Sequence, residues 1–421
     1  MLRRAMLIVQ KFGGTSVGTT DRIRKVARRI AAAKRAGHDV VTVVSAMGHT
    51  TDELVDLAAQ VAPDARKKHK REMDMLLTAG ERIAMALVAM AVREEGVEAL
   101  SFTGSQAAII TDEAHTGARI QEIRADRVKE EIGRGRAVVV AGFQGVSRSR
   151  EITTLGRGGS DTTAVALAVA LGADRCDIYT DVDGVFSADP RRVPNARLLS
   201  WVDSSQMVEL ASSGAQVMHP RAVELGARYD MPIRVLSSFR DDDGVCTLIT
   251  RRDPMQPIEG MVLTGLASDR GYARMVIRGL PPTMAAAARV LEAFGEAKVS
   301  LDMVTVSEQG DGLRQLELTV KEDAVPEGEI VAGKLVEELH AQGVDVRNSL
   351  TRIALVGSGM QERSGVYAQE FQALLRAGVE VYTVSSSAIS IQVLVDADKE
   401  NVALAALHDA FELAEVPGSA R

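Results

Sequence analysis

The chain is poor in the residues that mark several classes of protein. Aromatic residues make up 3% of its 421 residues, so the cores depend on Ala, Val, Leu and Met. The two cysteines, Cys176 and Cys246, are too few for a disulfide framework, which predicts a cytoplasmic protein. No two of the seven histidines lie three or four residues apart, a spacing typical of zinc sites. We therefore expect no protein-bound metal.

Basic runs and long apolar runs are also scarce. The net charge is −7, and the basic cluster at residues 66–71 has no interleaved aromatic residues. We interpret that cluster as a solvated helix start rather than a nucleic-acid patch. No apolar run approaches the ~20 residues of a membrane span, and the short apolar stretch after Met1 runs straight into glycines, unlike a signal peptide. The composition predicts a soluble protein that binds neither nucleic acid nor membrane.

The first 250 residues alternate between strand-like and helix-like patterns. Residues 40–44 and 137–141 are apolar throughout, as in buried strands, and the helical patterns at 22–36 and 161–171 end at glycines. Such alternation predicts an α/β fold with a mainly parallel sheet covered by helices on both faces. Sheets of this kind bind ligands beyond the carboxyl ends of their strands.

Composition changes at residues 241–244 and 251–260, where Pro254 and Pro257 indicate a linker. Beyond it the sequence repeats with an offset of 80 residues, and each copy has the pattern strand, helix, strand, strand of a small α+β module. A chance match in composition is the alternative to duplication. The length allows two or three domains, and we expect them at 1–250, 262–342 and 343–421. The matched residues are Val276, Gly279 and Leu280 with Val356, Gly359 and Met360; Leu291 and Phe294 with Phe371 and Leu374; and Val299, Leu301 and Val304 with Val379, Val381 and Val384.

A lysine stands in front of a glycine pair near the start of the chain. Lys11 follows an apolar stretch, Gly13 and Gly14 come next, and a helical pattern begins at Asp21. Glycines let the backbone approach phosphate oxygens, and amides at a helix start point outward. The order is the reverse of the Walker pattern. The motif predicts half of an anion site, and the alternative is a tight turn with a surface lysine.

A second glycine-rich segment, residues 156–161, is predicted to form the other half of this anion site. Arg157 offers a fork-shaped guanidinium suited to a carboxylate, and Asp161 places a carboxylate at a helix start. Ser160 or Asp161 could serve only as a helix N-cap. That alternative leaves the three glycines and the arginine unexplained.

A third segment, residues 179–191, is an acidic loop after a strand. Asp181, Asp183 and Gly184 have the spacing of a calcium loop, but the glutamate needed at its far end is missing. Beside an anion site, such a loop is expected to surround a nucleotide and its magnesium.

Together these segments resemble the aspartate kinase family of the amino acid kinase superfamily. The resemblance extends over nearly the whole chain, and the C-terminal repeat is similar to the paired ACT regulatory modules of these enzymes. It implies an amino acid kinase fold followed by two ferredoxin-like ACT modules. Further family motifs lie at residues 43–48, 50–54, 77–82 and 101–106.

The resemblance implies transfer of the ATP γ-phosphate, as the magnesium complex, to the side-chain carboxylate of L-aspartate. The product, 4-phospho-L-aspartate, opens the biosynthesis of lysine, threonine, methionine and isoleucine. The implied catalytic residues are Lys11 and Asp161. The implied substrate contacts are Thr50, Thr51, Glu81, Arg157, Gly158, Gly159 and Ser160. The implied ATP contacts are Lys11, Phe12, Gly13, Gly14, Ser45, Thr180, Asp181, Phe186, Ser187, Ala188, Asp189, Pro190, Arg191 and Gln216.

Several positions depart from the family pattern. His49 stands where relatives have aspartate, Gln216 replaces a lysine that helps bind ATP, and Thr116-Gly117 replaces a Gly-Asn pair. The ACT turn at 280–284 has no glycine, and the segments at 359–365 and 386–390 differ from the sequences usual in the family, which changes the glycine amides and paired charges that capture an amino acid. Lysine and threonine are the expected effectors, and these changes predict weakened or altered feedback.

Small ACT modules complete their sheets across partners, so we expect a homo-oligomer or a complex with a regulatory subunit made of the C-terminal part alone. Two other functions remain open at the level of sequence. One is a kinase for glutamate or N-acetylglutamate, opposed by the motif Gly80-Glu81-Arg82 and by the paired ACT-like modules. The other is a non-catalytic amino-acid sensor, opposed by intact Lys11, Arg157 and Asp161.

Overall fold

The computed structural model describes residues 5–240, 244–251, 262–309, 312–360 and 364–414. The chain divides into two compact units. Unit 1 comprises residues 1–186, 198–212 and 216–258, and unit 2 comprises residues 187–197, 213–215 and 259–421. Most of the linker expected at 241–244 and 251–260 lies outside the described residues.

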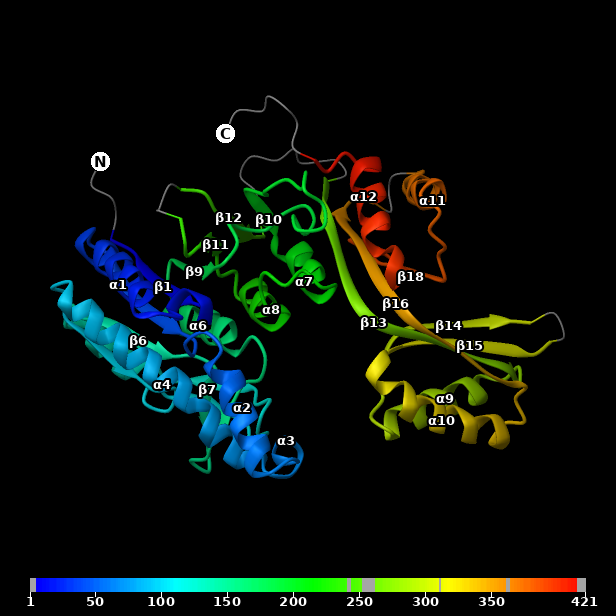
Figure 1. Ribbon diagram of the computed structural model, residues 1–421, viewed down its shortest axis with the longest axis horizontal. Helices are drawn as coiled ribbons and strands as arrows, with labels where there is room; N and C mark the ends of the chain where they lie inside the picture. The colour runs from blue at the N-terminus through cyan, green and yellow to red at the C-terminus, as the bar shows by residue number, and fades with distance from the viewer. Residues whose placement is uncertain (1–4, 241–243, 252–261, 310–311, 361–363, 415–421) are drawn as a thin grey trace. The chain divides into compact units, whose positions relative to one another are not determined.

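The centre of unit 1 is an eight-stranded sheet with the order β10-β12-β11-β9-β1-β2-β6-β3 (Figure 1). All neighbouring strands are parallel except β11 and β12. This confirms the predicted mainly parallel α/β sheet. The strands are β1 (Leu7–Phe12), β2 (Asp39–Val44), β3 (Ala99–Phe102), β6 (Ala137–Ala141), β9 (Arg175–Thr180), β10 (Trp201–Asp203), β11 (Ile233–Ser237) and β12 (Thr247–Thr250).

Helices cover both faces of this sheet. On one face, α1 (Thr20–Arg35) and α4 (Lys70–Glu94) share a core with β2 and β6 that contains Ile30 and Val88. On the other face, α6 (Gly159–Leu171) packs against β1, β2 and β9. The glycines that end α1 and α6 have positive φ angles of 86° and 65°, as expected for left-handed helix ends. The remaining helices of unit 1 are α2 (Thr50–Val61), α3 (Ala65–Lys68), α5 (Asp126–Gly133), α7 (Ser204–Ser212) and α8 (Pro220–Arg228).

Helix α4 is the one described helix long and apolar enough to cross a membrane by length and composition. From the sequence we expected no apolar run long enough to span a membrane. Half of its most apolar window is buried, and Ala84, Val88 and Val92 lie in the core of unit 1. The helix is therefore apolar because it supports the sheet, as core helices of soluble proteins do.

A second, four-stranded sheet in unit 1 has the order β5-β4-β7-β8. Its strands are β4 (Ile109–Thr111), β5 (Ile120–Ile123), β7 (Gln144–Ser147) and β8 (Ile152–Thr154). Strand β8 leads directly into the glycine-rich segment before α6. The second glycine segment therefore follows this small sheet, whereas Lys11 belongs to the large one.

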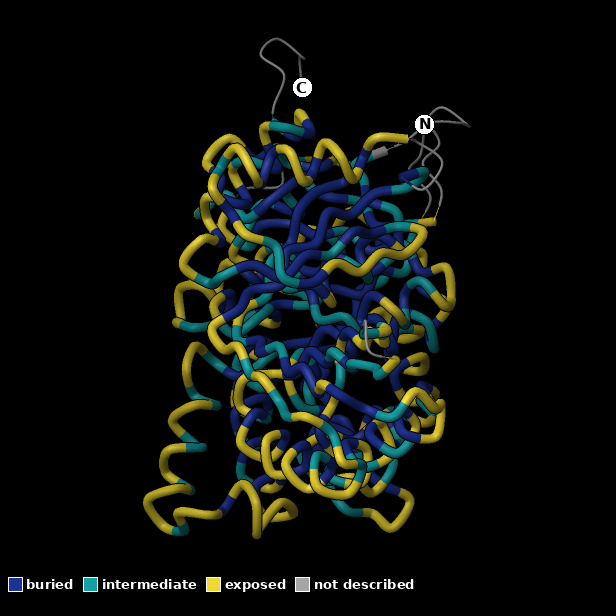
Figure 2. Tube along the Cα trace, turned by 90° about the vertical axis from the view of Figure 1, so that its right-hand side faces the viewer, coloured by how far each residue is buried: buried dark blue, intermediate teal, exposed yellow. Residues whose placement is uncertain are grey.

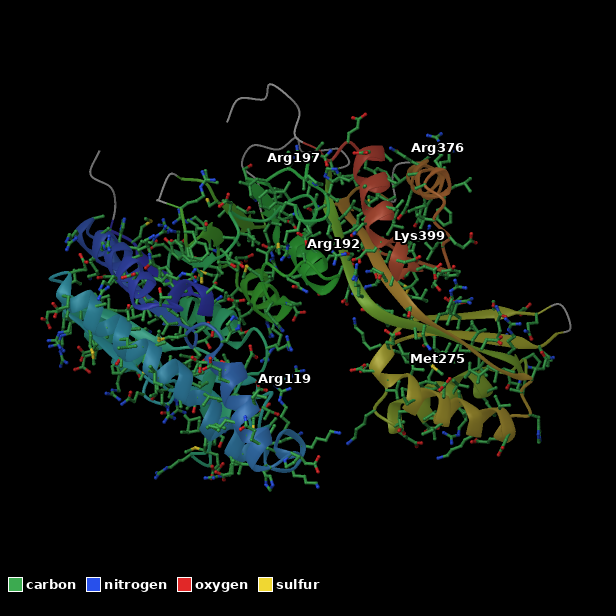
Figure 3. All side chains as sticks on the ribbon, viewed as in Figure 1. Arg119, Arg192, Arg197, Met275, Arg376 and Lys399 are labelled. Carbon is green, nitrogen blue, oxygen red and sulfur yellow. The ribbon has the colours of Figure 1, made fainter. Side chains whose placement is uncertain are left out.

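Unit 2 contains one antiparallel sheet with the order β14-β15-β13-β16-β18-β17. The sequence repeat appears as two βαββα copies, and Met275 in the first copy lies on β13 (Figure 3). The first copy is β13 (Val262–Leu280), α9 (Met284–Glu296), β14 (Leu301–Glu308), β15 (Arg314–Lys321) and α10 (Val325–Glu338). The second is β16 (Gly343–Ser358), α11 (Val366–Arg376), β17 (Thr383–Ser386), β18 (Ser390–Asp396) and α12 (Glu400–Ala410).

The two long strands join the copies. The first half of β13, residues 262–270, pairs with residues 351–358 of β16, and residues 272–278 pair with residues 343–350. Each copy therefore uses a strand segment from the other. Buried residues concentrate on the central strands and exposed residues on outer turns and helices (Figure 2), whereas the edge strands β14 and β17 are largely exposed.

Candidate active site

A cavity of about 570 Å³ lies in unit 1 where β1, α2, α4 and the β8–α6 loop meet. Its lining includes most of the residues predicted to carry the reaction and bind the substrate, together with Gly14 and Ser45, which were predicted as ATP contacts. Those residues are Lys11, Gly14, Ser45, Thr51, Glu81, Arg157, Gly158, Gly159, Ser160 and Asp161.

Lys11 and Asp161 form an ion pair inside this cavity. Their Nζ and Oδ1 atoms are 2.7 Å apart, and each side chain is only 12% exposed. Lys11 extends from β1 and Asp161 from the first turn of α6, where the helix dipole stabilises a carboxylate. Because the pair is shielded from water, the Lys11 ammonium attracts a bound anion more strongly than a surface ammonium would. The convergence expected from the two glycine segments is thus observed.

A close backbone contact requires glycine at position 14, and the space at position 13 is tight. A Cβ atom on Gly14 would lie 2.9 Å from the Ala46 carbonyl oxygen, and one on Gly13 would lie 3.3 Å from the Lys11 Nζ. The Gly14 carbonyl in turn accepts a hydrogen bond from the Gly48 amide at 3.0 Å. The turn after β1 is therefore fixed against the loop after β2. This is more than a simple turn with a surface lysine.

The Arg157 loop uses two glycines in left-handed conformations. Gly156 has a φ of 76° and Gly158 a φ of 66°. Gly158 is the N-cap of α6 and no side chain caps the helix, so Ser160 and Asp161 are not N-caps. A Cβ on Gly158 would lie 2.1 Å from the His219 ring, which covers this glycine. Burial lowers the pKa of His219, which favours the neutral ring.

Glu81 is buried at the bottom of the site, with a residue exposure of 3%. Its Oε1 accepts a hydrogen bond from the Ala46 amide at 3.1 Å, while Oε2 has no hydrogen-bond partner among the described residues. Burial raises the pKa of Glu81 to about 7, against the opposing effect of the Ala46 amide. The free carboxylate oxygen is suited to a ligand ammonium group.

Other predicted contacts lie outside this lining. Phe12 is fully buried and stacks on Tyr179 with ring centroids 4.5 Å apart, and Gln216 is exposed. Ser187 to Arg191 belong to unit 2, where Arg192 pairs with Glu400 of α12. The predicted contacts absent from the cavity lining are Thr50, Phe12, Gly13, Thr180, Asp181, Phe186, Ser187, Ala188, Asp189, Pro190, Arg191 and Gln216.

Three lining or supporting residues were not singled out from the sequence. Asp52 of α2 and Arg66 of α3 both line the cavity. Arg66 belongs to the basic cluster interpreted as a solvated helix start, and only its neighbour Ala65 is buried there. Asp74 of α4 is fully buried beneath the site. An acidic residue seven positions before Glu81, on the same face of a long apolar helix, was the available signal for it.

The described residues contain no group of three or more His, Cys, Asp or Glu side chains placed to hold a metal ion. His49 is exposed and lies 3.7 Å from Asp52, so it forms at most a surface pair at the edge of α2.

Comparison with known proteins places this geometry in a family. A model of the amino acid kinase family matches residues 6–237, and a model of the ACT domain matches residues 353–411. The chain is 48% identical over 410 residues to an aspartokinase of Mycolicibacterium smegmatis, covering 97% of this chain and 96% of that protein. It is 42% identical over 407 residues to an aspartate kinase of Stutzerimonas stutzeri, covering 97% of each.

Solved structures agree with these sequence matches. The crystal structure of E. coli aspartokinase III in complex with aspartate and ADP superposes with a TM-score of 0.80 at 25% identity, covering 96% of this chain and all of that one. The lysine and aspartate complex of the same E. coli enzyme gives a TM-score of 0.70. The chain therefore belongs to the amino acid kinase family and, within it, to the aspartokinases.

Proposed function

We propose that this protein transfers the γ-phosphoryl group of ATP to the β-carboxylate of L-aspartate, giving 4-phospho-L-aspartate. One observation carries the proposal. The Lys11–Asp161 ion pair, at 2.7 Å, lines the same cavity as Arg157 and Glu81. Lys11, which can stabilise phosphoryl charge, thus lies in the same cavity as a cation for the carboxylate of an amino acid, Arg157, and an anion for its ammonium group, Glu81.

The chemistry requires little covalent help from the protein. The attacking carboxylate is already ionised at neutral pH, so no general base is needed. Positioning and charge neutralisation supply most of the acceleration in phosphoryl transfer. Lys11 neutralises charge that develops on the transferred group, with amides of Gly13 and Gly14 beside it. Asp161 holds the Lys11 ammonium in place.

Aspartate is recognised by residues of opposite sign. The Arg157 guanidinium binds a carboxylate through its fork of donors, and the free Oε2 of Glu81 accepts from the ammonium group. Thr51 and Ser160 add hydrogen bonds from the cavity wall, and Thr50 begins the helix that carries Thr51.

The nucleotide is ATP, and Mg²⁺ reaches the site on its phosphates, as is usual for this ion. The aspartokinase III structure that contains ADP supports a nucleotide substrate for this family. Loss of the family lysine at Gln216 should weaken ATP binding without abolishing it. The proposed nucleotide contacts are Lys11, Phe12, Gly13, Gly14, Ser45, Thr180, Asp181, Phe186, Ser187, Ala188, Asp189, Pro190, Arg191 and Gln216.

An ATP-dependent hydroxamate assay tests the proposal directly. Hydroxylamine traps the acyl phosphate, so aspartate should give aspartyl hydroxamate, whereas glutamate and N-acetylglutamate should give none. A signal with glutamate alone would overturn the substrate assignment. No signal with any of these carboxylates would favour an amino-acid sensor.

Regulation forms a second part of the proposal. We assign a kinase domain to residues 1–250 and ACT modules to residues 262–342 and 343–421, with lysine and threonine as candidate effectors. The turn before α9 ends at Thr283, which caps the helix through the Ala286 amide, and the β17–β18 turn is closed by Ser387 and Ser390. These turns offer few charged groups for an amino acid, which supports weak feedback. Strong concerted inhibition of aspartate phosphorylation by both amino acids would contradict this part.

The proposed setting is a cytoplasmic homo-oligomer assembled through the ACT modules, or a complex with a separate C-terminal regulatory subunit. Light scattering of the purified protein measures its mass. Co-expression with residues 255–421 then tests for the mixed complex, because Met255 offers an internal start.

A further inference from the structure

The loop that carries Arg157 is held by two charged residues that do not line the cavity. The first is Asp74 of α4, which is fully buried. Its carboxylate lies 2.7 Å from the His115 Nδ1 and accepts from the Thr116 amide at 3.1 and 3.2 Å. It also accepts from the Thr154 hydroxyl at 2.6 Å. Charge-assisted hydrogen bonds are strong, so these contacts hold the Asp74 side chain and its partners in one arrangement.

Two of these partners form the cavity wall. Thr116 and Thr154 both line the cavity, and Thr116 has a φ of 67°, an unusual conformation for a residue with a Cβ. The Thr116 carbonyl oxygen lies 3.2 Å from where a Cβ of Gly156 would be. The segment fixed by Asp74 therefore presses against the residue just before Arg157.

Arg221 of α8 ties the same two segments together from another side. Its Nη1 donates to the Leu155 carbonyl at 2.8 Å, and its Nη2 donates to the Ala118 carbonyl at 3.1 Å. The Ala118 amide also donates to the Thr154 carbonyl at 2.8 Å. One planar guanidinium thus spans the 115–118 segment and the β8–α6 loop. Arg119, labelled in Figure 3, directly follows this segment and leads into β5.

Arg157 itself is exposed and makes no ion pair with any described residue. Its side chain gains no order from a charged partner, so its direction depends on its backbone. A binding group on a mobile loop must lose conformational freedom when it binds, which weakens affinity. A loop already fixed by Asp74 and Arg221 avoids most of that cost.

We propose that Asp74 and Arg221 are positioning residues that hold the Arg157 guanidinium toward the substrate carboxylate. The inference rests on the proposed function, because Arg157 is assigned there to aspartate. Neither residue is expected to touch a substrate. Their contribution acts through the 115–118 segment and the β8–α6 loop.

The test compares Asp74→Asn and Arg221→Lys with the wild-type full-length protein in the hydroxamate assay. Asn keeps the size of Asp74 but loses its charge and has one acceptor oxygen instead of two, so its NH2 group faces either the Thr154 hydroxyl or the His115 ring. Lys keeps the charge of Arg221 but cannot reach both carbonyls. Each variant should raise the KM for aspartate roughly tenfold while the KM for ATP changes less than about twofold. Glu131→Gln is the matched control, because Glu131 is a buried carboxylate of α5 bonded to Arg134 and Arg136 and does not line the cavity.

A double-mutant cycle separates positioning from general stability. In an Arg157→Lys background, Asp74→Asn should raise the KM for aspartate by less than about twofold, because the group it positions has already been changed. A thermal shift curve for every variant reports folding. An unchanged KM for aspartate in both Asp74→Asn and Arg221→Lys would overturn the inference. Equal rises in the KM for aspartate and the KM for ATP that follow the loss of thermal stability would also overturn it. Full additivity of the effects of Asp74→Asn and Arg157→Lys on the KM for aspartate would do the same.

If Asp74→Asn does not fold, Arg221→Lys alone decides, since Arg221 is only partly buried at the start of α8. Failure of the proposed function has a different signature. The wild-type protein would then give no aspartyl hydroxamate at all, whereas failure of this inference leaves the wild-type signal intact.

Discussion

Glu81 accepts a hydrogen bond from the Ala46 amide through one carboxylate oxygen and leaves the other free in the cavity. The contact joins α4 to the loop after β2. Ala46 is pressed against α4 at Gly80, where a Cβ would lie 2.7 Å from the Ala46 Cβ. The small residue at position 80 thus places the carboxylate of its neighbour.

Aspartate binding should weaken as the pH falls below neutrality. The pKa of Glu81 is about 7, so the side chain becomes neutral below that pH and can no longer pair with the substrate ammonium. The KM for aspartate should be about tenfold higher at pH 6 than at pH 8, because only the ionised fraction binds. The ammonium of aspartate stays protonated over this range. Steady-state kinetics at several pH values measure the change.

The Glu81→Gln variant provides the control for this pH effect. Gln can still accept from the Ala46 amide but is neutral at every pH. Its KM for aspartate should be high and nearly constant from pH 6 to pH 8. A wild-type profile as flat as that of the variant would show that Glu81 does not bind the ammonium group.

Removal of the Lys11 ammonium should reduce turnover more than binding. We expect Lys11→Met to lower kcat by about 10²- to 10³-fold, the range for loss of a preorganised group that stabilises transition-state charge. Lys34→Met is a close control, because Lys34 is also 12% exposed and is ion-paired to Asp39 at 3.0 Å. Asp39 begins β2, whereas the cavity lies at the other end of that strand. Single-turnover measurements separate the chemical step from binding. A Lys11→Met enzyme with the turnover of Lys34→Met would contradict the role of Lys11.

The catalytic half of the site could be predicted from sequence because its signals are local. Lys11, the glycine pair and Asp161 each stand at a strand end or helix start, and such junctions are visible in hydrophobic periodicity. Their 2.7 Å approach joins two sheets, because Lys11 lies on β1 of the large sheet and Asp161 follows β8 of the small one, so the periodicity alone does not give it. The two copies in unit 2 were likewise visible as a repeat.

The supporting half was not predictable, because its contacts join distant parts of the chain. Asp74 bonds to a residue 42 positions away, and Arg221 bonds to one 103 positions away. The helix cap shows the same limit. Ser160 and Asp161 were plausible N-caps by type, but Gly158 takes the cap position under the His219 ring. No local pattern contains that contact.

Arg66 should help to attract the anionic substrates. It lines the cavity from α3 and makes no ion pair with any described residue. Arg66→Ala should raise the KM for aspartate or ATP about two- to fivefold, the size expected for one exposed charge. The effect should shrink as salt is added. Lys67→Ala removes the same charge from the next residue, which does not line the cavity. If Arg66→Ala and Lys67→Ala raise KM equally, Arg66 acts only through the net charge of the protein and not through its place in the cavity.

Glu370 should lower the stability of unit 2 at neutral and higher pH. It occupies the position in α11 that Val290 has in α9, and both side chains are fully buried. Neither carboxylate oxygen has a hydrogen-bond partner among the described residues. Burial raises the pKa of Glu370 from 4.5 to about 7. Below pH 4.5 the group is neutral in both the folded and the unfolded chain, so its ionisation does not lower the free energy of unfolding.

Between pH 4.5 and pH 7 the unfolded chain ionises first, so stability falls as the pH rises and then levels off above pH 7. Glu370→Gln stays neutral throughout and should be more stable than the wild type by roughly 3 kcal/mol at pH 8, with no gain near pH 4.5.

Glu400→Gln is the matched control, because Glu400 is equally buried in α12 but bonded to Ser268 and Arg270. That variant should melt at a lower temperature at pH 8. Thermal denaturation of the three proteins at both pH values measures the difference, and a Glu370→Gln protein no more stable than the wild type at pH 8 would mean that Glu370 is solvated or paired in solution.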